Sequence, residues 1–283
     1  ARDRVLLVEP DFLPLLEEVI GELPDLQHVV VLGPDTAGTT IPGAVAYEDL
    51  IAPMPTEYDE PALDERSAAG LCYTSGTTGS AKGVLATHRS TFLHALAVSS
   101  AAGMCIGPGD SVMPQVPMFH ASAWGMPHAS VAVGAKLVLY GGPLEAASFV
   151  DLMLDEDVTI AAGVPTVWLA VADELVGRDL TASRLRHVVC GGSQPPRVMI
   201  ERYARDFDIP VIQAWGMTET SPLASLAWPQ QRMRDWPEEQ VLDAARTQAG
   251  LPLPGVLLDI RGDAGESLPF DGASMGALHV RGP

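Results

Sequence analysis

Glycine and hydroxyl side chains surround a single lysine between residues 73 and 84, where the chain reads YTSGTTGSAKGV. Clustered glycines let backbone N–H groups approach an anion closely, and serine and threonine hydroxyls add further donors. Lys82 adds a positive charge for phosphate oxygens. The spacing is not that of a Walker A loop, because Ala81 and Gly83 stand where that loop needs Gly and Ser or Thr. The segment predicts a phosphate-binding loop of another type, and the competing interpretation is a flexible surface loop.

Three further segments could contribute to a site. QAWGMTET, residues 213–220, places an aromatic ring, a threonine and a carboxylate directly after an expected strand. A carboxylate there can hold a metal ion that offsets charge when two anions meet, although Glu219 alone would more often be a solvated acid. VVCGGSQPP, residues 188–196, contains a Gly-Gly pair that by itself predicts only a turn. Residues 116–142 contain His120 and Trp124, and each could equally be a core residue.

The glycine-rich segment resembles the phosphate-binding loop of the adenylate-forming (ANL) superfamily, which includes acyl-CoA synthetases, peptide-synthetase adenylation domains and luciferases. The usual motif there is (Y/F)-T-(S/T)-G-(S/T)-T-G-x-P-K-G-V, and this chain departs from it once, with Ala81 in place of proline. Since the phosphate-facing groups remain, we expect the loop to keep its role with somewhat greater mobility. The resemblance implies that ATP phosphates contact Thr74, Ser75, Gly76, Thr77, Thr78, Gly79 and Lys82.

Residues 213–220 resemble the aromatic-G-x-T-E motif of the same superfamily. The resemblance implies that Trp215 stacks against adenine, that Thr218 contacts the α-phosphate and that Glu219 binds Mg2+, with Thr74 as a second metal contact. The GGS segment resembles the loop that borders adenine, although Gln194 and Pro195 replace two small residues there. The implied nucleotide contacts in these two loops are Gly191, Gly192, Ser193, Ala214, Trp215, Gly216, Met217 and Thr218.

Residues 116–142 resemble the P-M-F-H-x-x-A-W segment of medium- and long-chain fatty acyl-CoA synthetases, and residues 162–171 resemble a second segment of that subfamily. The resemblance implies that His120 lies near the substrate carboxylate and that Trp124 gates a fatty-acid tunnel. Val164 and Pro165 complete the expected substrate contacts. The residues expected to support catalysis are Lys82, His120, Thr218 and Glu219. The other histidines show no metal-binding spacing and are interpreted as structural.

The amino-acid composition limits which classes of partner the protein can bind and which cellular compartment suits it. The 283 residues include 17 Lys and Arg against 36 Asp and Glu, a net charge of -19, which argues against nucleic acid because phosphate contacts need a basic surface. The three cysteines, Cys72, Cys105 and Cys190, are far apart and indicate free thiols in a reducing compartment. No apolar run reaches the length of a membrane span. We therefore expect a cytoplasmic protein without a transmembrane segment.

Apolar periodicity predicts strands that alternate with helices, which indicates an α/β fold with a parallel sheet. Strands are expected at residues 5–8, 28–32, 70–73, 84–87, 135–139, 159–162, 186–190, 210–214, 256–261 and 276–280, and helices at residues 12–23, 90–102, 148–156, 165–175 and 197–207. Residues 33–66 are expected to be an irregular connection. The resemblance implies the layered αβαβα architecture of the adenylate-forming N-terminal domain. We predict a nucleotide- and acyl-binding part at residues 1–249 and the start of a β-barrel subdomain at residues 250–283.

The predicted function is AMP-forming activation of a fatty acid by ATP and Mg2+, followed by transfer of the acyl group to CoA. Two alternatives stay open, namely a truncated fragment that at most binds nucleotide and an enzyme that adenylates an aromatic or amino acid. The ribose-binding Asp and the C-terminal lid of the superfamily find no counterpart in the sequence, and we expect them beyond Pro283. The 283 residues alone are therefore not expected to make acyl-CoA at a useful rate. A homodimer of the full-length protein is also kept open.

Overall fold

The computed structural model of the chain describes residues 2–33, 35–36, 39–75, 79–142, 145–181 and 183–282. The chain divides into two compact units, Ala1–Leu63 and Asp64–Pro283. The boundary that we predict between residues 249 and 250 lies inside the second unit, close to where a separate antiparallel sheet begins, and it stays a prediction.

The first unit is a small parallel sheet with short helices. Its strands pair in the order β1-β2-β3, and its elements are β1 (Val5–Val8), η1 (Pro10–Phe12), α1 (Leu13–Val19), η2 (Ile20–Glu22), β2 (His28–Val31), β3 (Val45–Ala46) and α2 (Tyr47–Ile51). Leu13 and Leu16 of α1 are buried against Val29 and Val31 of β2. The predicted strand-helix-strand order is confirmed. The irregular connection predicted for residues 33–66 is partly wrong, because β3 and α2 were too short to produce a recognisable period.

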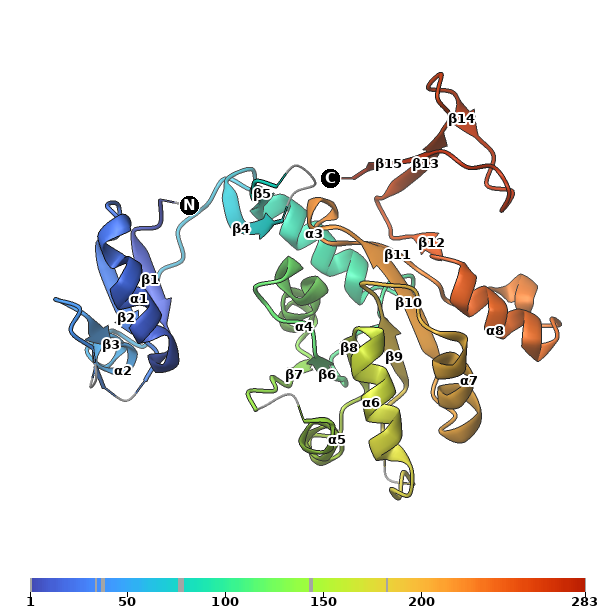
Figure 1. Ribbon diagram of the computed structural model, residues 1–283, viewed down its shortest axis with the longest axis horizontal. Helices are drawn as coiled ribbons and strands as arrows, with labels where there is room; N and C mark the ends of the chain where they lie inside the picture. Colours follow the sequence, from blue (N-terminus) through green and yellow to red (C-terminus); the bar gives the residue numbers. More distant parts are fainter. Residues whose placement is uncertain are drawn as a thin grey trace. The chain divides into compact units, whose positions relative to one another are not determined.

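The second unit is organised around a seven-stranded sheet (Figure 1). Its order is β12-β11-β10-β9-β8-β6-β7, with β6 (Ser111–Pro114), β7 (Lys136–Leu137), β8 (Ile160–Gly163), β9 (His187–Cys190), β10 (Val211–Gly216), β11 (Leu223–Leu226) and β12 (Leu251–Pro252). The strands from β10 to β7 are parallel to one another, and β11 and β12 continue the sheet antiparallel. The four residues of β8 and of β9 are buried, as expected for strands covered on both faces.

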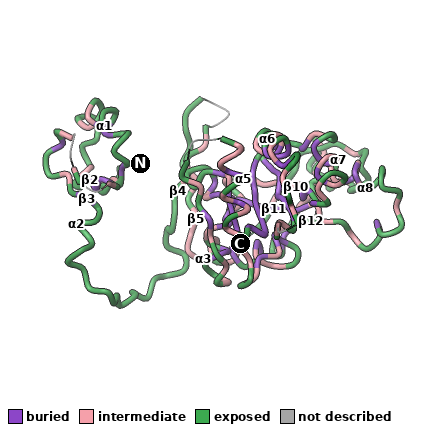
Figure 2. The backbone as a smooth tube through the Cα atoms, turned by 90° about the horizontal axis from the view of Figure 1, so that it is seen from below, coloured by how far each residue is buried: buried purple, intermediate pink, exposed green. Residues whose placement is uncertain are grey.

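Helices cover both faces of this sheet. They are α3 (His88–Ser99), α4 (Met126–Val133), α5 (Ala146–Asp155), α6 (Pro165–Leu175), α7 (Arg197–Asp206) and α8 (Glu238–Thr247). Successive strand residues point to opposite faces, so Ile160 and Ala162 of β8 pack in the core with α3 and α4, and Ala161 packs in the core with α5 to α8. Buried residues consequently follow the sheet and the inner sides of its helices (Figure 2). This layered arrangement confirms the predicted α/β class.

Two small antiparallel sheets complete the second unit. One is the hairpin of β4 (Ala68–Thr74) and β5 (Lys82–Thr87), and the other joins β13 (Leu257–Arg261), β14 (Ser267–Leu268) and β15 (Ala277–Arg281) in the order β14-β13-β15. Two single turns of 3-10 helix are η4 (Thr218–Thr220) and η5 (Gln231–Met233), and the short segment η3 (Ala121–Gly125) has left-handed backbone. The sheet of β13 to β15 agrees with the antiparallel strands expected there.

Some predicted boundaries were wrong, and some elements were not predicted. The helix expected to reach residue 102 ends at Ser99, because Ser100 has extended backbone (ψ 168°) and the Met104 N–H turns back to the Val98 carbonyl. The elements β6, α4, β11 and α8 were not predicted. Each of β6 and β11 is four residues long and wholly buried, so neither shows the polar alternation that marks a half-buried strand.

The structure agrees with the expectation of free thiols and, in its described part, with that of no membrane-spanning helix. Cys72, Cys105 and Cys190 are free thiols. Burial raises the pKa of the Cys190 thiol to about 12, which suits an inert core residue. In the part of the chain that the structure describes, every helix is too short or too polar to span a bilayer.

Candidate active site

The loops singled out in the sequence follow neighbouring parallel strands. Residues 217–222 follow β10, residues 191–196 follow β9, Val164 follows β8, and residues 115–125 follow β6. These four strands are adjacent and parallel, so their carboxyl ends share one edge of the sheet. In open α/β sheets ligands bind in the crevice beyond this edge. The fold thus brings four of the predicted segments together.

The loop that carries Glu219, which we call the glutamate loop (Met217–Pro222), is closed by its own hydrogen bonds. The Met217 N–H donates to the Pro222 carbonyl at 3.0 Å and to Thr220 Oγ1 at 2.9 Å. A Cβ at Gly216 would lie 2.1 Å from the Pro222 carbonyl oxygen, so only glycine fits where the loop leaves β10. Thr220 therefore organises the loop, although the sequence assigned it no role, and Glu219 is left exposed at its tip.

Trp124 packs directly against the predicted adenine loop. A Cβ at Gly191 would lie 2.9 Å from Trp124 Cη2 and 3.0 Å from the Ala214 carbonyl oxygen. The glycine is thus required by close packing between the acyl segment and β10. Trp124 is only 6% exposed and belongs to the core that contains α3 and α4. Its predicted role at a tunnel stays a prediction.

Trp124 is held on an unusual turn. Ala121, Ser122, Ala123 and Trp124 have φ values between 47° and 56°, and Gly125 has φ 75°, so five consecutive residues are left-handed. For residues other than glycine this conformation costs about 1–2 kcal/mol each, and surrounding contacts must offset the cost. We call this segment the left-handed turn (Ala121–Gly125). Backbone strain of this kind is concentrated at functional sites.

The phosphate hairpin (β4–β5) presents the glycine-rich loop. Thr74 and Lys82 pair across the hairpin at the base of that loop, and both strands contact α3. Lys82 is exposed, as a phosphate-binding lysine must be before its ligand arrives. Ser75 and Gly79 border the loop, and Gly79 has φ 86°. The predicted contacts Gly76, Thr77 and Thr78 lie outside the described residues.

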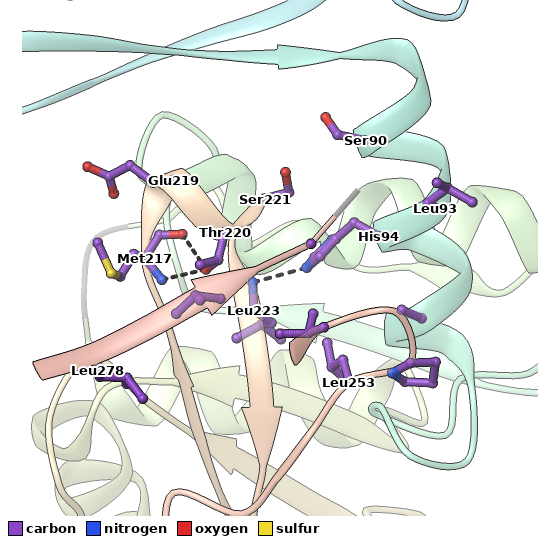
Figure 3. A pocket seen from close by; sticks show the side chains of 15 residues that line it. Ser90, Leu93, His94, Met217, Glu219, Thr220, Ser221, Leu223, Leu253 and Leu278 are labelled. Carbon is purple, nitrogen blue, oxygen red and sulfur yellow. Dashed lines mark hydrogen bonds between the residues drawn. The ribbon is translucent and has the colours of Figure 1, made fainter. Parts of the chain in front are cut away.

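Two cavities lie beside the glutamate loop. The first has a volume of about 320 Å³ and lies among α3, the glutamate loop, the segment between β12 and β13, and β15 (Figure 3). The second, of about 180 Å³, is lined by the phosphate hairpin, the left-handed turn and the glutamate loop. Thr218 lines the second cavity, and Glu219 lines both. The strands of the phosphate hairpin, through Gly70, Cys72 and Val84, and the glutamate loop therefore face the same space, whereas Lys82 does not line it.

The remaining predicted substrate contacts are placed differently. His120 is exposed and precedes the left-handed turn, and it does not line either of these two cavities. Val164 is 37% exposed, and a Cβ at Gly192 would lie 3.2 Å from its Cγ1. Pro165 is buried at the start of α6. Val164 thus lies beside the predicted adenine loop, and the roles of His120, Val164 and Pro165 stay predictions.

His94 is the most prominent residue that the sequence reading left without a role in the site. It is 7% exposed on α3, and its Nε2 accepts the Leu223 N–H at 3.0 Å. Figure 3 shows its ring projecting from α3 toward the backbone of Leu223. His94 lines both cavities together with Glu219 and Ser221. No motif spacing marks this histidine, because its partners come from distant parts of the chain.

The side chains around Glu219 suit a hard divalent ion. Mg2+ takes oxygen ligands and usually binds through one or two carboxylates together with water and substrate phosphates. Glu219 supplies an exposed carboxylate, and Thr218 and Ser221 line the second cavity beside it. Among the described residues no three His, Cys, Asp or Glu side chains are grouped as a metal site. An ion here would rely on phosphate ligands, and Thr74 as a second contact stays a prediction.

Two buried histidines make the stability of the second unit depend on pH. Burial lowers the pKa of His94 and of His187 from 6.5 to about 4 in each case. Between these pH values the unfolded chain binds protons that the folded chain excludes, so stability is complete above pH 6.5 and decreases as the pH falls toward 4. We expect a slope of up to about 2.5 kcal/mol per pH unit in mid-window.

Urea unfolding followed by tryptophan fluorescence measures this slope. All five tryptophans belong to the second unit, so the signal reports on that unit alone. The variant His94→Gln should lose about half of the slope, because one of the two titrating groups is gone. A free energy of unfolding that stays constant between pH 6.5 and about 4 would contradict the prediction.

Comparison with known proteins identifies the family of this chain. The sequence profile of the family described as AMP-binding enzyme matches residues 1–283. The chain is 42% identical over its full length to the medium-chain-fatty-acid–CoA ligase of Ectopseudomonas oleovorans, of which it covers 52%. It is also 42% identical over its full length to the long-chain-fatty-acid–CoA ligase of Thermus thermophilus, of which it covers 51%. The chain thus spans about half the length of these curated relatives.

Solved structures agree on the fold. A crystal structure of an anthranilate CoA ligase in complex with anthranoyl-AMP matches 99% of this chain and 50% of its own, with a TM-score of 0.79 and 24% identity. A long-chain-fatty-acid-CoA ligase from Archaeoglobus fulgidus matches 99% of this chain and 53% of its own, with a TM-score of 0.80 and 20% identity. The similarity to these structures shows a shared fold. With a profile match from the first residue to the last, this chain belongs to the AMP-binding enzyme family.

Proposed function

We propose that this chain supplies the nucleotide- and acyl-binding part of an AMP-forming fatty acid–CoA ligase. The observation that carries the proposal is the second cavity, where the phosphate hairpin and the glutamate loop face one space. The hairpin carries Lys82 at the base of its loop, outside the lining of this cavity, and the glutamate loop offers the carboxylate of Glu219 to the cavity. The two relatives described above are named as ligases of medium- and long-chain fatty acids.

The proposed reaction makes an inert carboxylate reactive in two steps. A carboxylate oxygen of the fatty acid attacks the α-phosphorus of ATP, and the bond to the bridging oxygen of the β-phosphate breaks, so that pyrophosphate leaves. The thiol of CoA then loses its proton and attacks the acyl carbon, and AMP leaves with the oxygen that linked it to the acyl group. The products are AMP, pyrophosphate and the acyl thioester.

The first step brings two anions together, and the residues of this chain would reduce that cost. Lys82 would bind phosphate oxygens, and Thr218 would donate to the α-phosphate. Mg2+ held by Glu219 would neutralise phosphate charge and orient the leaving group. Trp215, half-buried at the end of β10, would stack against adenine. The groups are placed before the reaction begins, so little reorganisation is needed in the transition state.

An apolar acid is favoured over an amino acid as the substrate. The predicted acyl contacts are apolar, since Trp124 packs in the core and Val164 is 37% exposed beside the predicted adenine loop. A relative named 3-methylmercaptopropionyl-CoA ligase, from Ruegeria lacuscaerulensis, is 39% identical to this chain, so a shorter acid is also within reach of this scaffold. We infer a fatty acid and leave its length to the measurement on Trp124 described below.

The variant Lys82→Ala tests the nucleotide site. Loss of one charge-assisted contact should weaken ATP binding by about 1.5–3 kcal/mol, or about 10- to 150-fold in Kd. Titration calorimetry on the 283-residue chain measures the change. The chain has only two lysines, and Lys136→Ala is the matched control, because Lys136 pairs with Glu156 on the surface. If Lys82→Ala binds ATP as tightly as wild type, the assignment of the glycine-rich loop as the phosphate-binding loop is wrong.

The variant Trp124→Ala tests the acyl assignment in the complete gene product that contains this chain. If Trp124 lines a tunnel, removal of its ring should change the ranking of kcat/KM among acids of increasing chain length more than it changes the KM for ATP. The control variant Trp236→Ala removes a half-buried tryptophan far from the left-handed turn in the sequence. If Trp124→Ala lowers only the stability and leaves the ranking unchanged, Trp124 is a core residue.

The alternative of a non-catalytic, nucleotide-binding fragment has a direct test. Sequencing the DNA that flanks this coding segment will show whether the open frame continues into a ribose-binding Asp and a lid with a catalytic Lys. A frame that ends without them, together with absent adenylate formation, would favour the non-catalytic alternative. We also propose a cytoplasmic location, because free cysteines suit a reducing compartment. Homodimer formation stays a prediction for sedimentation measurements on the complete gene product.

A further inference from the structure

His94 connects two parts of the site that are distant in the sequence. Its Nε2 accepts the N–H of Leu223, the residue that follows the glutamate loop. The pairing of β10 with β11 shifts register between Trp215 and Gly216, and the Leu223 N–H lies beside this bulge. A buried N–H needs an acceptor, and the histidine side chain is the acceptor found here.

The Nδ1–Cε1 edge of the same ring lies against the left-handed turn. A Cβ at Gly125 would lie 2.5 Å from both Cε1 and Nδ1 of His94, so the turn can approach the ring only because residue 125 is glycine. The left-handed backbone of Ala121 to Trp124 is strained and must be stabilised by its surroundings. The His94 ring packs against Gly125 and so helps to stabilise the turn that positions Trp124.

His94 is neutral at neutral pH, as a side chain that accepts a hydrogen bond through Nε2 must be. Burial lowers the pKa of His94 to about 4, and the nearby His128 acts in the same direction. The neutral ring therefore keeps a lone pair on Nε2 at neutral pH. The titratable groups that share the cavity walls with His94 are Cys72, His128 and Glu219.

We propose that His94 is a positioning residue that holds the glutamate loop in register with the left-handed turn. The proposal rests on the proposed function, since the loop carries Glu219 and the turn carries Trp124. An ordinary core histidine would contribute packing alone. His94 instead joins the end of one predicted catalytic segment to the predicted acyl segment through one hydrogen bond and one close ring contact. Adenylate formation should then depend on the acceptor atom at Nε2, and the dependence should act through Glu219.

Two amides that differ only in reach give the sharpest test. Glutamine places its oxygen near the position of Nε2, whereas asparagine reaches only to the position of Nδ1. In the complete gene product, His94→Gln should keep kcat for adenylate formation within about threefold of wild type. His94→Asn should lower it by about tenfold to a hundredfold, because the buried Leu223 N–H loses its acceptor. Equal rates for the two variants would overturn the proposal.

A double variant shows whether the effect passes through Glu219. In a Glu219→Gln background, the further change His94→Asn should lower kcat by less than about twofold, because the loop no longer presents the carboxylate that His94 positions. A merely structural role predicts that the two losses multiply, and that result would overturn the proposal. Urea unfolding of each variant shows whether a lower rate reflects a loss of folded protein instead.

Hydrogen exchange separates this inference from the proposed function, because it requires no activity. In the 283-residue chain the Leu223 amide should exchange faster in His94→Asn than in wild type, and His94→Gln should retain the protection. Unchanged protection in His94→Asn would refute the positioning role even if the ligase assignment is correct. Conversely, faster exchange in His94→Asn, together with a complete wild-type gene product that forms no adenylate, would support the His94 contact and refute the proposed function.

Discussion

The variant Glu219→Gln is expected to lower the rate of adenylate formation by about 10²- to 10³-fold, the range for removal of one preorganised electrostatic contact. Glutamine keeps the size of the side chain and loses its charge, so a metal ion beside the phosphates is held less well. Because Glu219 is exposed at the tip of the glutamate loop, the fold should not change. The loop is closed by bonds among Met217, Thr220 and Pro222, which the substitution does not touch.

ATP–pyrophosphate exchange in the complete gene product measures this effect. The rate should be followed as Mg2+ is increased, since weaker metal binding raises the Mg2+ concentration for half-maximal rate. Glu57→Gln is the matched control, because Glu57 is an exposed residue of the first unit and does not line either cavity. An exchange rate equal to that of wild type at saturating Mg2+ would falsify the role of Glu219.

The variant Trp168→Ala is expected to lower the free energy of unfolding of the second unit by about 3–5 kcal/mol. Trp168 is fully buried, and its ring meets Phe149 and Tyr203 edge to face with centroid separations of 6.4 and 6.3 Å. Its Nε1 donates to the carbonyls of Gly163 and Val189, at 3.2 and 3.1 Å. These bonds tie together the carboxyl ends of β8 and β9, from which two of the predicted binding loops begin.

Urea unfolding monitored by the four remaining tryptophans gives this free energy. The variant Trp168→Phe should cost about 1–3 kcal/mol, since most of the ring volume stays while two buried carbonyls lose their donor. Phe270→Ala is the control, because Phe270 is 68% exposed and such surface changes are worth about 0.5 kcal/mol or less. If Trp168→Ala lowers the free energy of unfolding no more than the control does, the packing of Trp168 does not stabilise the second unit.

Part of the site could be predicted from the sequence because its signals are local. A glycine-rich loop can present backbone donors wherever it occurs, and the segments around Lys82 and Glu219 were predicted from their own residues. The helix expected at Pro165–Leu175 has those bounds in the structure, because proline suits the first turn of a helix. The alternation of apolar runs was likewise enough to predict a parallel α/β fold, since period and length are properties of short segments.

Contacts between distant segments were decided only by the tertiary structure. The strands β6 and β11 are uniformly buried, and a four-residue apolar run has no period to distinguish it from a helix. The requirement for glycine at residue 191 arises from Trp124 and Ala214, and the bond of His94 arises from Leu223, 129 positions away. Local residue types indicated which loops are candidates for binding an anion. The order of the strands determined which loops meet, because adjacency in a sheet depends on the packing of the whole chain.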